Sequence, residues 1–404
     1  MNRIAFACLW LFVFTIPWER SLQLGGESGS VGRVAGFLAL GMGLWAVGSQ
    51  GRMRRLGAFH ILALAFLMLV SVSFFWTADP VDSPHTIRVY YQSMWVLWLI
   101  WEFAQDQQRL SQLRIAFVLG ECVLVALTVQ TFLNGRILDR AKEARFSAEG
   151  WGPNPMAIML VMGVPFACYM AVRSESLWER WIGIVSLILI PFGVLLTSSR
   201  NGLIGLAISM LTLPLLLRRY RASTKMLFVV VLLIAVFVGV IVLPSQTWLR
   251  LATIGEDVSR GGMNDRVGIW KYGMMAFPAH SWVGVGAGAW QAGTGNFFAP
   301  HNTYLEVLVE EGMAGFTLYL LILGSVTRGI VSSRGANRVA SGVLMVSFLV
   351  CTMAIHLAES ASMWFVLGWI IAQGSASETP DCAVTAGEAP GLLAAEVGSM
   401  LSPR

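Results

Sequence analysis

The segment around His301 combines a titratable imidazole with a signal for the start of a helix. Pro300 precedes it, and proline is favoured as the first helical residue, because its missing N–H needs no partner there. We therefore expect a helix from Pro300 that places His301 in its first turn, on one face with Leu305, Leu308 and Gly312. The positive end of the helix dipole would keep the imidazole neutral and able to take a proton from a hydroxyl. The alternative is a histidine that only caps the helix or lies at the membrane interface.

Two arginines in other segments have the chemistry of anion binders. Arg200 lies in the short turn Thr197–Gly202 between two apolar runs, and its permanently charged, forked guanidinium suits phosphate or carboxylate. Arg266 lies in the longest polar segment, Pro244–Pro300, where Asp265–Phe277 is the best candidate helix. The alternative for Arg200 is an interfacial anchor that pairs with lipid headgroups.

A third group of charges lies in the segment Asn134–Pro155. Its cations form a modestly basic lip, which can bind phosphates or simply face solvent and lipid. The cations are Arg136, Arg140, Lys142 and Arg145, and Asn154 follows them.

Metal and nucleotide chemistry are not indicated. No two histidines have the spacing of a zinc pair on a helix, so we predict no metal and no cofactor. Gly284, Gly286 and Gly288 superficially match a nucleotide loop, but they lack its strand–turn–helix context. Four other histidines, His60, His85, His280 and His356, compete with His301, and His280 and His356 are expected to be structural.

These residues must be held by elements that composition identifies as membrane helices. The 404 residues are 56% hydrophobic and 13% charged, with a mean hydropathy of +0.67, against about 25% charged residues in soluble domains. A water-soluble globule is excluded, and long apolar runs favour helices over a barrel. The net charge of +5 is typical of membrane topology, and no basic, aromatic-rich soluble segment predicts nucleic-acid binding.

We therefore predict an all-α polytopic membrane protein. A crossing takes about 20 apolar residues, and the sequence has room for about twelve transmembrane helices. The predicted spans are Ile4–Pro17, which we interpret as an uncleaved first helix, Val34–Val47, Phe59–Phe75, Val89–Phe103, Ile115–Leu133, Met156–Val172, Trp178–Leu196, Leu203–Leu217, Met226–Leu243, Met313–Thr327, Val339–Ile355 and Ser362–Gln373.

The charges also predict the orientation. If the N-terminus lies inside, the short inner connections are rich in arginine, as the positive-inside rule requires, and both termini are cytoplasmic. The outer cations then gather in two longer segments, 134–155 and 244–312, where we expect function. The predicted regions are N-terminal transmembrane helices over 1–133, a catalytic membrane region over 134–327, C-terminal transmembrane helices over 328–373 and a flexible cytoplasmic tail over 374–404.

Taken together, these features resemble the O-antigen ligase and polymerase superfamily. The resemblance rests on the order of several short motifs between Arg145 and Gly315, each of them weak alone. They are Arg145 with Asn154, Ser199-Arg200-Asn201-Gly202, Asp265-Arg266 with Trp270, Pro278 with Gly284-Val285-Gly286, and His301-Asn302-x-x-Leu305-x-x-Leu308-x-x-x-Gly312.

The resemblance implies a GT-C-like glycosyltransferase in a bacterial inner membrane, with its active site facing the periplasm. Such enzymes take a glycan from undecaprenyl diphosphate, and the ligases join it to lipid A–core oligosaccharide, with neither metal nor nucleotide. His301 would be the general base, and Arg200 and Arg266 would bind the diphosphate. Arg140, Lys142 and Arg145, with Asn154 and Asn302, would contact substrate.

Several alternatives stay open. A polymerase would extend the lipid-linked glycan, and Arg250 with Gly261 fits an Arg-x10-Gly motif once, a match that arises easily by chance. A protein glycosyltransferase would modify Ser or Thr. A transporter or flippase of lipid-linked sugar would place ionisable residues such as Glu121 deep within the spans.

Overall fold

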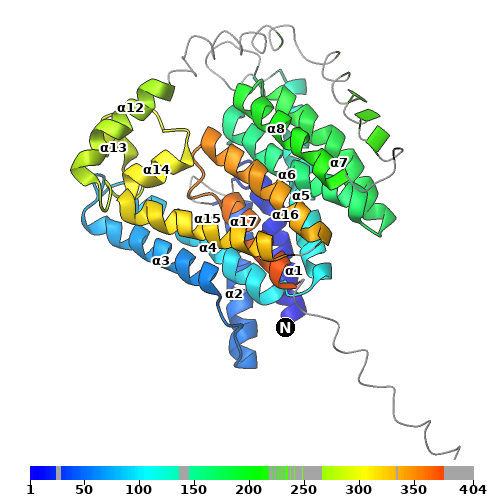
Figure 1. Ribbon diagram of the computed structural model, residues 1–404, viewed down its shortest axis with the longest axis horizontal. Helices are drawn as coiled ribbons and strands as arrows, with labels where there is room; N and C mark the ends of the chain where they lie inside the picture. Colours follow the sequence, from blue (N-terminus) through cyan, green and yellow to red (C-terminus); the bar gives the residue numbers. More distant parts are fainter. Residues whose placement is uncertain are drawn as a thin grey trace, which may run out of the picture.

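The computed structural model describes residues 1–23, 29–135, 145–217, 266–333 and 335–376, and single positions between 222 and 248. Within them the chain is helical and contains no strand, which confirms the all-α prediction (Figure 1). The first half has α1 Asn2–Thr15, η1 Ile16–Trp18, α2 Val31–Gln50, α3 Ala58–Val72, η2 Ser73–Phe75, α4 Ser83–Phe103, α5 Gln107–Leu133, α6 Pro153–Arg173, α7 Leu177–Leu196 and α8 Arg200–Leu217. The second half has α12 Arg266–Ala276, η4 Phe277–His280, α13 Trp290–Thr294, α14 Thr303–Glu310, α15 Gly312–Ser332, α16 Gly335–Ala354 and α17 Ala361–Ala376.

The predicted spans coincide with helices wherever the structure describes them. In the described residues, eight helices are long and apolar enough to cross a membrane, and two shorter apolar helices, Asn2–Trp18 and Ala361–Ala376, join them. The span predicted at Met226–Leu243 and most of the tail predicted at 374–404 lie outside the described residues. The count of twelve crossings therefore stays a prediction.

Helix α2 shows how these helices pack. The side chain of Ser30 accepts a hydrogen bond from the Arg33 N–H at the start of the helix. Its buried face consists of glycines and alanines, which let α1 and α4 approach closely. The opposite face carries Phe37 and Trp45, which are more than half exposed. A small-residue face inside and large apolar side chains outside are what a helix in lipid requires.

A second, smaller unit lies at one end of the bundle, opposite the N-terminus (Figure 1). Here α12, α13 and α14 share a small core of their own, formed by Ile269, Val285, Ala289, Trp290 and Val309. The helix predicted at Asp265–Phe277 is confirmed as α12 with η4, although Asp265 itself lies outside the described residues.

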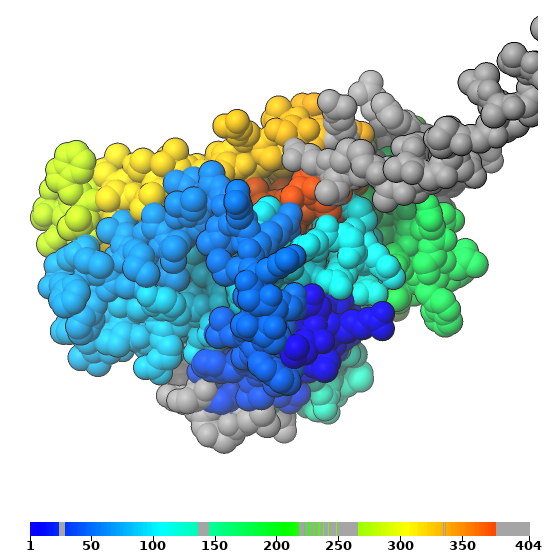
Figure 2. Space-filling model, turned by 90° about the horizontal axis from the view of Figure 1, so that it is seen from below, coloured from blue at the N-terminus to red at the C-terminus, as the bar shows by residue number. Residues whose placement is uncertain are grey.

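The glycine-rich run Gly284–Gly288 joins this unit to the bundle. The Gly286 N–H donates to the Glu310 carbonyl of α14, and the Val285 carbonyl accepts from the Ala78 N–H, in the connection from α3 to α4. Gly286 has a φ of 99°, and a Cβ there would lie 2.6 Å from Thr77. Figure 2 shows the unit at the edge of the molecule, beside α3. The run therefore has a structural role, which is consistent with rejecting the nucleotide loop.

Candidate active site

His301 lies immediately before α14, at the junction of the small unit and the bundle. The helix begins at Thr303, and Asn302 is its N-cap, with the side-chain oxygen accepting from the N–H groups of Tyr304 and Leu305 at 3.0 and 3.1 Å. The prediction that the helix begins at Pro300, with His301 in its first turn, is therefore wrong. An asparagine cap satisfies two otherwise free N–H groups, which makes it a stronger signal for the start of the helix than the preceding proline.

The backbone of His301 is itself unusual. Its φ is 48°, a left-handed conformation that few residues other than glycine adopt. The indole N–H of Trp270 in α12 donates to the Pro300 carbonyl at 2.8 Å and so ties the preceding residue to the small unit. The histidine is held in a strained conformation from both sides, a feature common at functional sites.

The environment of His301 keeps its imidazole neutral. The ring is half-buried, and its Nδ1 atom is buried with no hydrogen-bond partner. Burial, and then the positive charge of Arg266, lower the pKa of His301 to about 4. The neutral form agrees with the expectation from sequence, but its causes are burial and a neighbouring arginine rather than a helix dipole.

Arg266 is the first residue of α12 and is only 6% exposed. Burial lowers its pKa. Within the described part of the chain, no carboxylate forms an ion pair with it. Because a buried charge is expensive unless it is paired, a guanidinium with no carboxylate partner among the described residues, beside a half-buried imidazole, is suited to an anionic ligand.

Arg200 begins α8, after a turn that is held by residues from two other segments. Ser198 in this turn also has a left-handed backbone, with a φ of 49°. The Ser199 hydroxyl donates to the Asn154 side-chain oxygen at 2.8 Å, and the same oxygen accepts from Arg145 at 2.8 Å. Arg145 also donates to the Thr197 carbonyl at 3.4 Å.

The described contacts therefore place the candidate residues in two groups. Arg145 and Asn154 lie with the turn that precedes Arg200, and His301 lies with Arg266. Asn302, Arg145 and Asn154 all bind other parts of the protein, so each has a structural task beside any contact with substrate. Arg136, Arg140 and Lys142, together with Arg250 and Gly261, lie outside the described residues.

Sequence reasoning missed a second histidine in the site. His356, expected to be structural, lies with its ring centroid 5.4 Å from that of His301, and its Nδ1 is also buried without a partner. Burial is again the main cause that lowers its pKa to about 4, followed by His301, Arg20 and Arg266. The two histidines are far apart in sequence, and no spacing rule connects them.

The contact between the two histidines depends on Thr303. Its hydroxyl donates to the Ile355 carbonyl at 2.7 Å and accepts from the Leu357 N–H at 3.0 Å. These two bonds attach the start of α14 to the segment that carries His356. Thr303 therefore positions both rings, although it is one of the unspecified positions in the motif that begins at His301.

Three buried carboxyl groups, those of Glu306, Glu310 and Glu311, lie on α14 or directly at its end. Glu310 accepts from the N–H groups of Gly288 and Trp290 at 2.8 and 3.2 Å, and burial raises its pKa. Burial also raises the pKa values of Glu306 and Glu311. Among the residues that the structure describes, no group of three or more His, Cys, Asp or Glu is arranged to hold a metal ion.

Comparison with known proteins bears directly on the resemblance. The family model described as O-antigen ligase matches residues 184–320, which include most of α7, α8, α12, α14 and the candidate residues Arg200, Arg266 and His301. A search of curated proteins finds no match. With its long apolar helices, the chain is a multi-pass membrane protein. The segment that contains both arginines and the histidine matches the O-antigen ligase family model, and this match supports the resemblance inferred from the motifs.

Proposed function

We propose that this protein is an O-antigen ligase of the bacterial inner membrane. It transfers a glycan from undecaprenyl diphosphate to a sugar hydroxyl of lipid A–core oligosaccharide, at the periplasmic face and with inversion at the anomeric carbon. The observation that supports this proposal most is Arg266, a buried cation with no carboxylate partner in the described residues, next to the neutral imidazole of His301. Such a pair suits a reaction that expels an anion and removes a proton.

The proposed step is a single displacement. The acceptor oxygen forms a bond to the anomeric carbon, the bond from that carbon to the phosphate oxygen breaks, and the hydroxyl proton passes to His301. Arg266 and Arg200 stabilise the negative charge that develops on the leaving diphosphate. These cations supply the positive charge that a metal would supply elsewhere, so we expect the reaction to proceed without an added divalent ion.

The low pKa of His301 has a role in this scheme. A base with a pKa near 4 is deprotonated at neutral pH but is weak. Binding of a diphosphate beside Arg266 would offset the positive charge and favour the imidazolium, so the pKa of His301 would rise when the donor is present. The base would then be strongest when the donor is bound.

The test is in vitro transfer by the purified protein. A defined undecaprenyl-diphosphate glycan and rough lipopolysaccharide are supplied with EDTA, and wild type is compared with His301→Asn. Asparagine tolerates the left-handed backbone of residue 301, so the variant removes the base with little added strain. The matched control is His280→Asn at the exposed end of η4.

The proposal predicts a metal-independent ladder of modified lipopolysaccharide, reduced about 10²- to 10⁴-fold in His301→Asn and unchanged in His280→Asn. Lengthening of the lipid-linked glycan with no change in lipopolysaccharide would identify a polymerase instead. Absence of turnover with either acceptor would favour the transporter alternative.

A further inference from the structure

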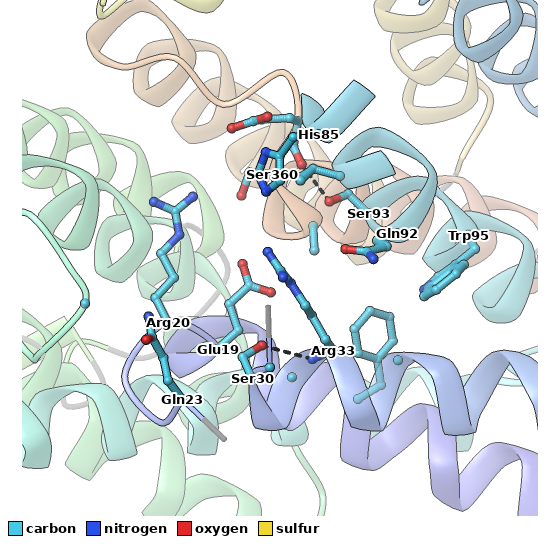
Figure 3. A pocket seen from close by; sticks show the side chains of 18 residues that line it. Glu19, Arg20, Gln23, Ser30, Arg33, His85, Gln92, Ser93, Trp95 and Ser360 are labelled. Carbon is cyan, nitrogen blue, oxygen red and sulfur yellow. Dashed lines mark hydrogen bonds between the residues drawn. The ribbon is translucent and has the colours of Figure 1, made fainter. Parts of the chain in front are cut away.

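A polar cavity lies beside the candidate active site and contains none of the residues assigned above. Its volume is about 260 Å³, far more than the roughly 10–15 Å³ needed for one water. It is formed where η1 ends, α2 and α4 begin, and α16 connects to α17 (Figure 3). The lining residues that matter here are Glu19, Arg20, Arg33, Gln92, Trp95 and Ser360.

The chemistry of the lining differs from that around Arg266. The Glu19 side chain lies between those of Arg20 and Arg33 (Figure 3), and burial raises its pKa while the two arginines oppose that rise. Glu359 is a second carboxyl group in the lining, so two carboxyl groups face two arginines and the formal charges balance. The cavity therefore has no marked preference for an anion. Gln92 and Ser360 add neutral donors and acceptors, and Trp95 adds an aromatic surface.

A neutral ligand with many hydroxyls fits such a lining best. Each hydroxyl can donate to a carboxylate or an amide oxygen and accept from a guanidinium or an amide N–H. The faces of a sugar ring carry C–H groups that can pack against an aromatic ring such as that of Trp95. A few polar groups that converge on a concave site beside an aromatic surface are typical of small-ligand pockets.

The cavity lies beside the segment that carries His356. Glu359 also lines it, and the Ser93 hydroxyl of α4 holds the Glu359 carbonyl at 2.6 Å. Burial raises the pKa of Glu359 and lowers that of His356, and the positive charge of Arg20 acts on both groups. The His356 ring lies beside His301. The cavity therefore lies on the His356 side of the proposed base, whereas Arg266 approaches His301 from α12.

We propose that this cavity binds one sugar unit of a substrate glycan. The inference rests on the proposed function, because it takes His301 as the base that receives the acceptor proton. His301 does not line the cavity, so the bound unit would be a neighbour of the sugar that loses its proton. The position of the cavity beside the segment that carries His356 favours the acceptor glycan over the donor glycan as the source of that unit.

Two variants test the cavity by different means. Gln92→Ala removes a polar lining group from the half-buried side of α4, and Val89→Trp fills the space without removing a charge. The matched controls are Gln130→Ala and Val72→Trp, at exposed positions of α5 and α3. Thermal unfolding and elution on size exclusion confirm that each variant is folded.

The readouts are calorimetric binding of delipidated core oligosaccharide to the purified protein, and KM for each substrate with the other one saturating. We expect Gln92→Ala to weaken oligosaccharide binding and raise the acceptor KM about three- to ten-fold, as the loss of one hydrogen bond predicts. Val89→Trp should weaken both by at least as much. The two control variants should behave as wild type.

The outcomes separate this inference from the proposed function. If wild type binds the oligosaccharide and Val89→Trp does not, the cavity is a sugar site even if no transfer occurs. A rise in the donor KM alone also supports a sugar site and assigns it to the donor glycan. If folded Gln92→Ala and Val89→Trp bind and transfer as wild type does, the cavity proposal is overturned while the ligase proposal stands.

Discussion

At the scale of single residues, the left-handed backbone at His301 brings a half-buried imidazole to the junction of two parts of the molecule. Non-glycine residues in this region carry strain of about 1–3 kcal/mol, and histidine is among the types that tolerate it better. The cap at Asn302 and the Trp270 bond to Pro300 fix the residues on either side. The site can therefore hold its base in one position before substrate arrives.

The pKa of His301 gives a prediction at this scale. Since the base must be neutral, activity is lost as the pH falls through its folded pKa, which is about 4 rather than the usual value near 6.5. The charged or titratable groups that act on the histidine pair are Arg266 from α12 and Arg20 after η1. We expect kcat/KM for the donor to have its acid limb near pH 4 and to be flat from pH 5.5 to 7 as far as His301 is concerned.

Two comparisons sharpen this measurement. The acid limb of kcat should lie at higher pH than that of kcat/KM, because the bound diphosphate raises the pKa of the base. Arg266→Gln removes a positive neighbour, so its kcat/KM limb should also move to higher pH while the rate falls. An acid limb near 6.5 in wild type, unmoved in Arg266→Gln, would contradict this assignment.

At the scale of elements, α14 is positioned by contacts at both ends. The two Thr303 bonds to Ile355 and Leu357 attach its start to the segment after α16. Glu310 at its last turn holds the backbone of the glycine-rich run. A short helix of this kind gains little stability from its own length, so these attachments decide where His301 lies.

Removing one attachment gives the prediction for this scale. Thr303→Val keeps the side-chain shape but leaves the Ile355 carbonyl and the Leu357 N–H without their partner. We expect a loss of about 1–3 kcal/mol in the free energy of unfolding, together with a fall in kcat as His301 and His356 move apart. The matched control is Thr327→Val in α15, whose hydroxyl bonds only to the Leu323 carbonyl of its own helix. Thermal unfolding and the transfer assay are measured for both variants. Equal, small effects in the two variants would show that Thr303 does not position the site.

At the scale of the whole molecule, the unit of α12 to α14 lies at one end of the bundle, and the N-terminus lies away from it (Figure 1). The large apolar side chains of α2 and of other long helices are exposed around the sides. This distribution suits a bundle surrounded by lipid, with its polar groups gathered at one end.

The orientation predicted from charge can be tested on the intact protein. In a variant without native cysteines, His280→Cys places a thiol at the exposed end of η4, and Ser332→Cys places one at the exposed end of α15. We expect a membrane-impermeant maleimide added to the periplasmic side to label residue 280 but not residue 332. Labelling in the reverse pattern would invert the topology and contradict a periplasmic site.

The sequence alone determined the class of the molecule, because the length and apolarity of a membrane helix are local properties that can be read from consecutive residues. It located the described spans and α12, and the order of its motifs predicted a family that the match over 184–320 supports. Only the tertiary structure decided that His356 lies beside His301 and that Asn154 joins Arg145 to the turn before Arg200. It also decided that η1, α2, α4 and the connection from α16 to α17 enclose a polar cavity. The physical reason is that these contacts join residues far apart in the chain, and they depend on how the helices pack rather than on any local pattern.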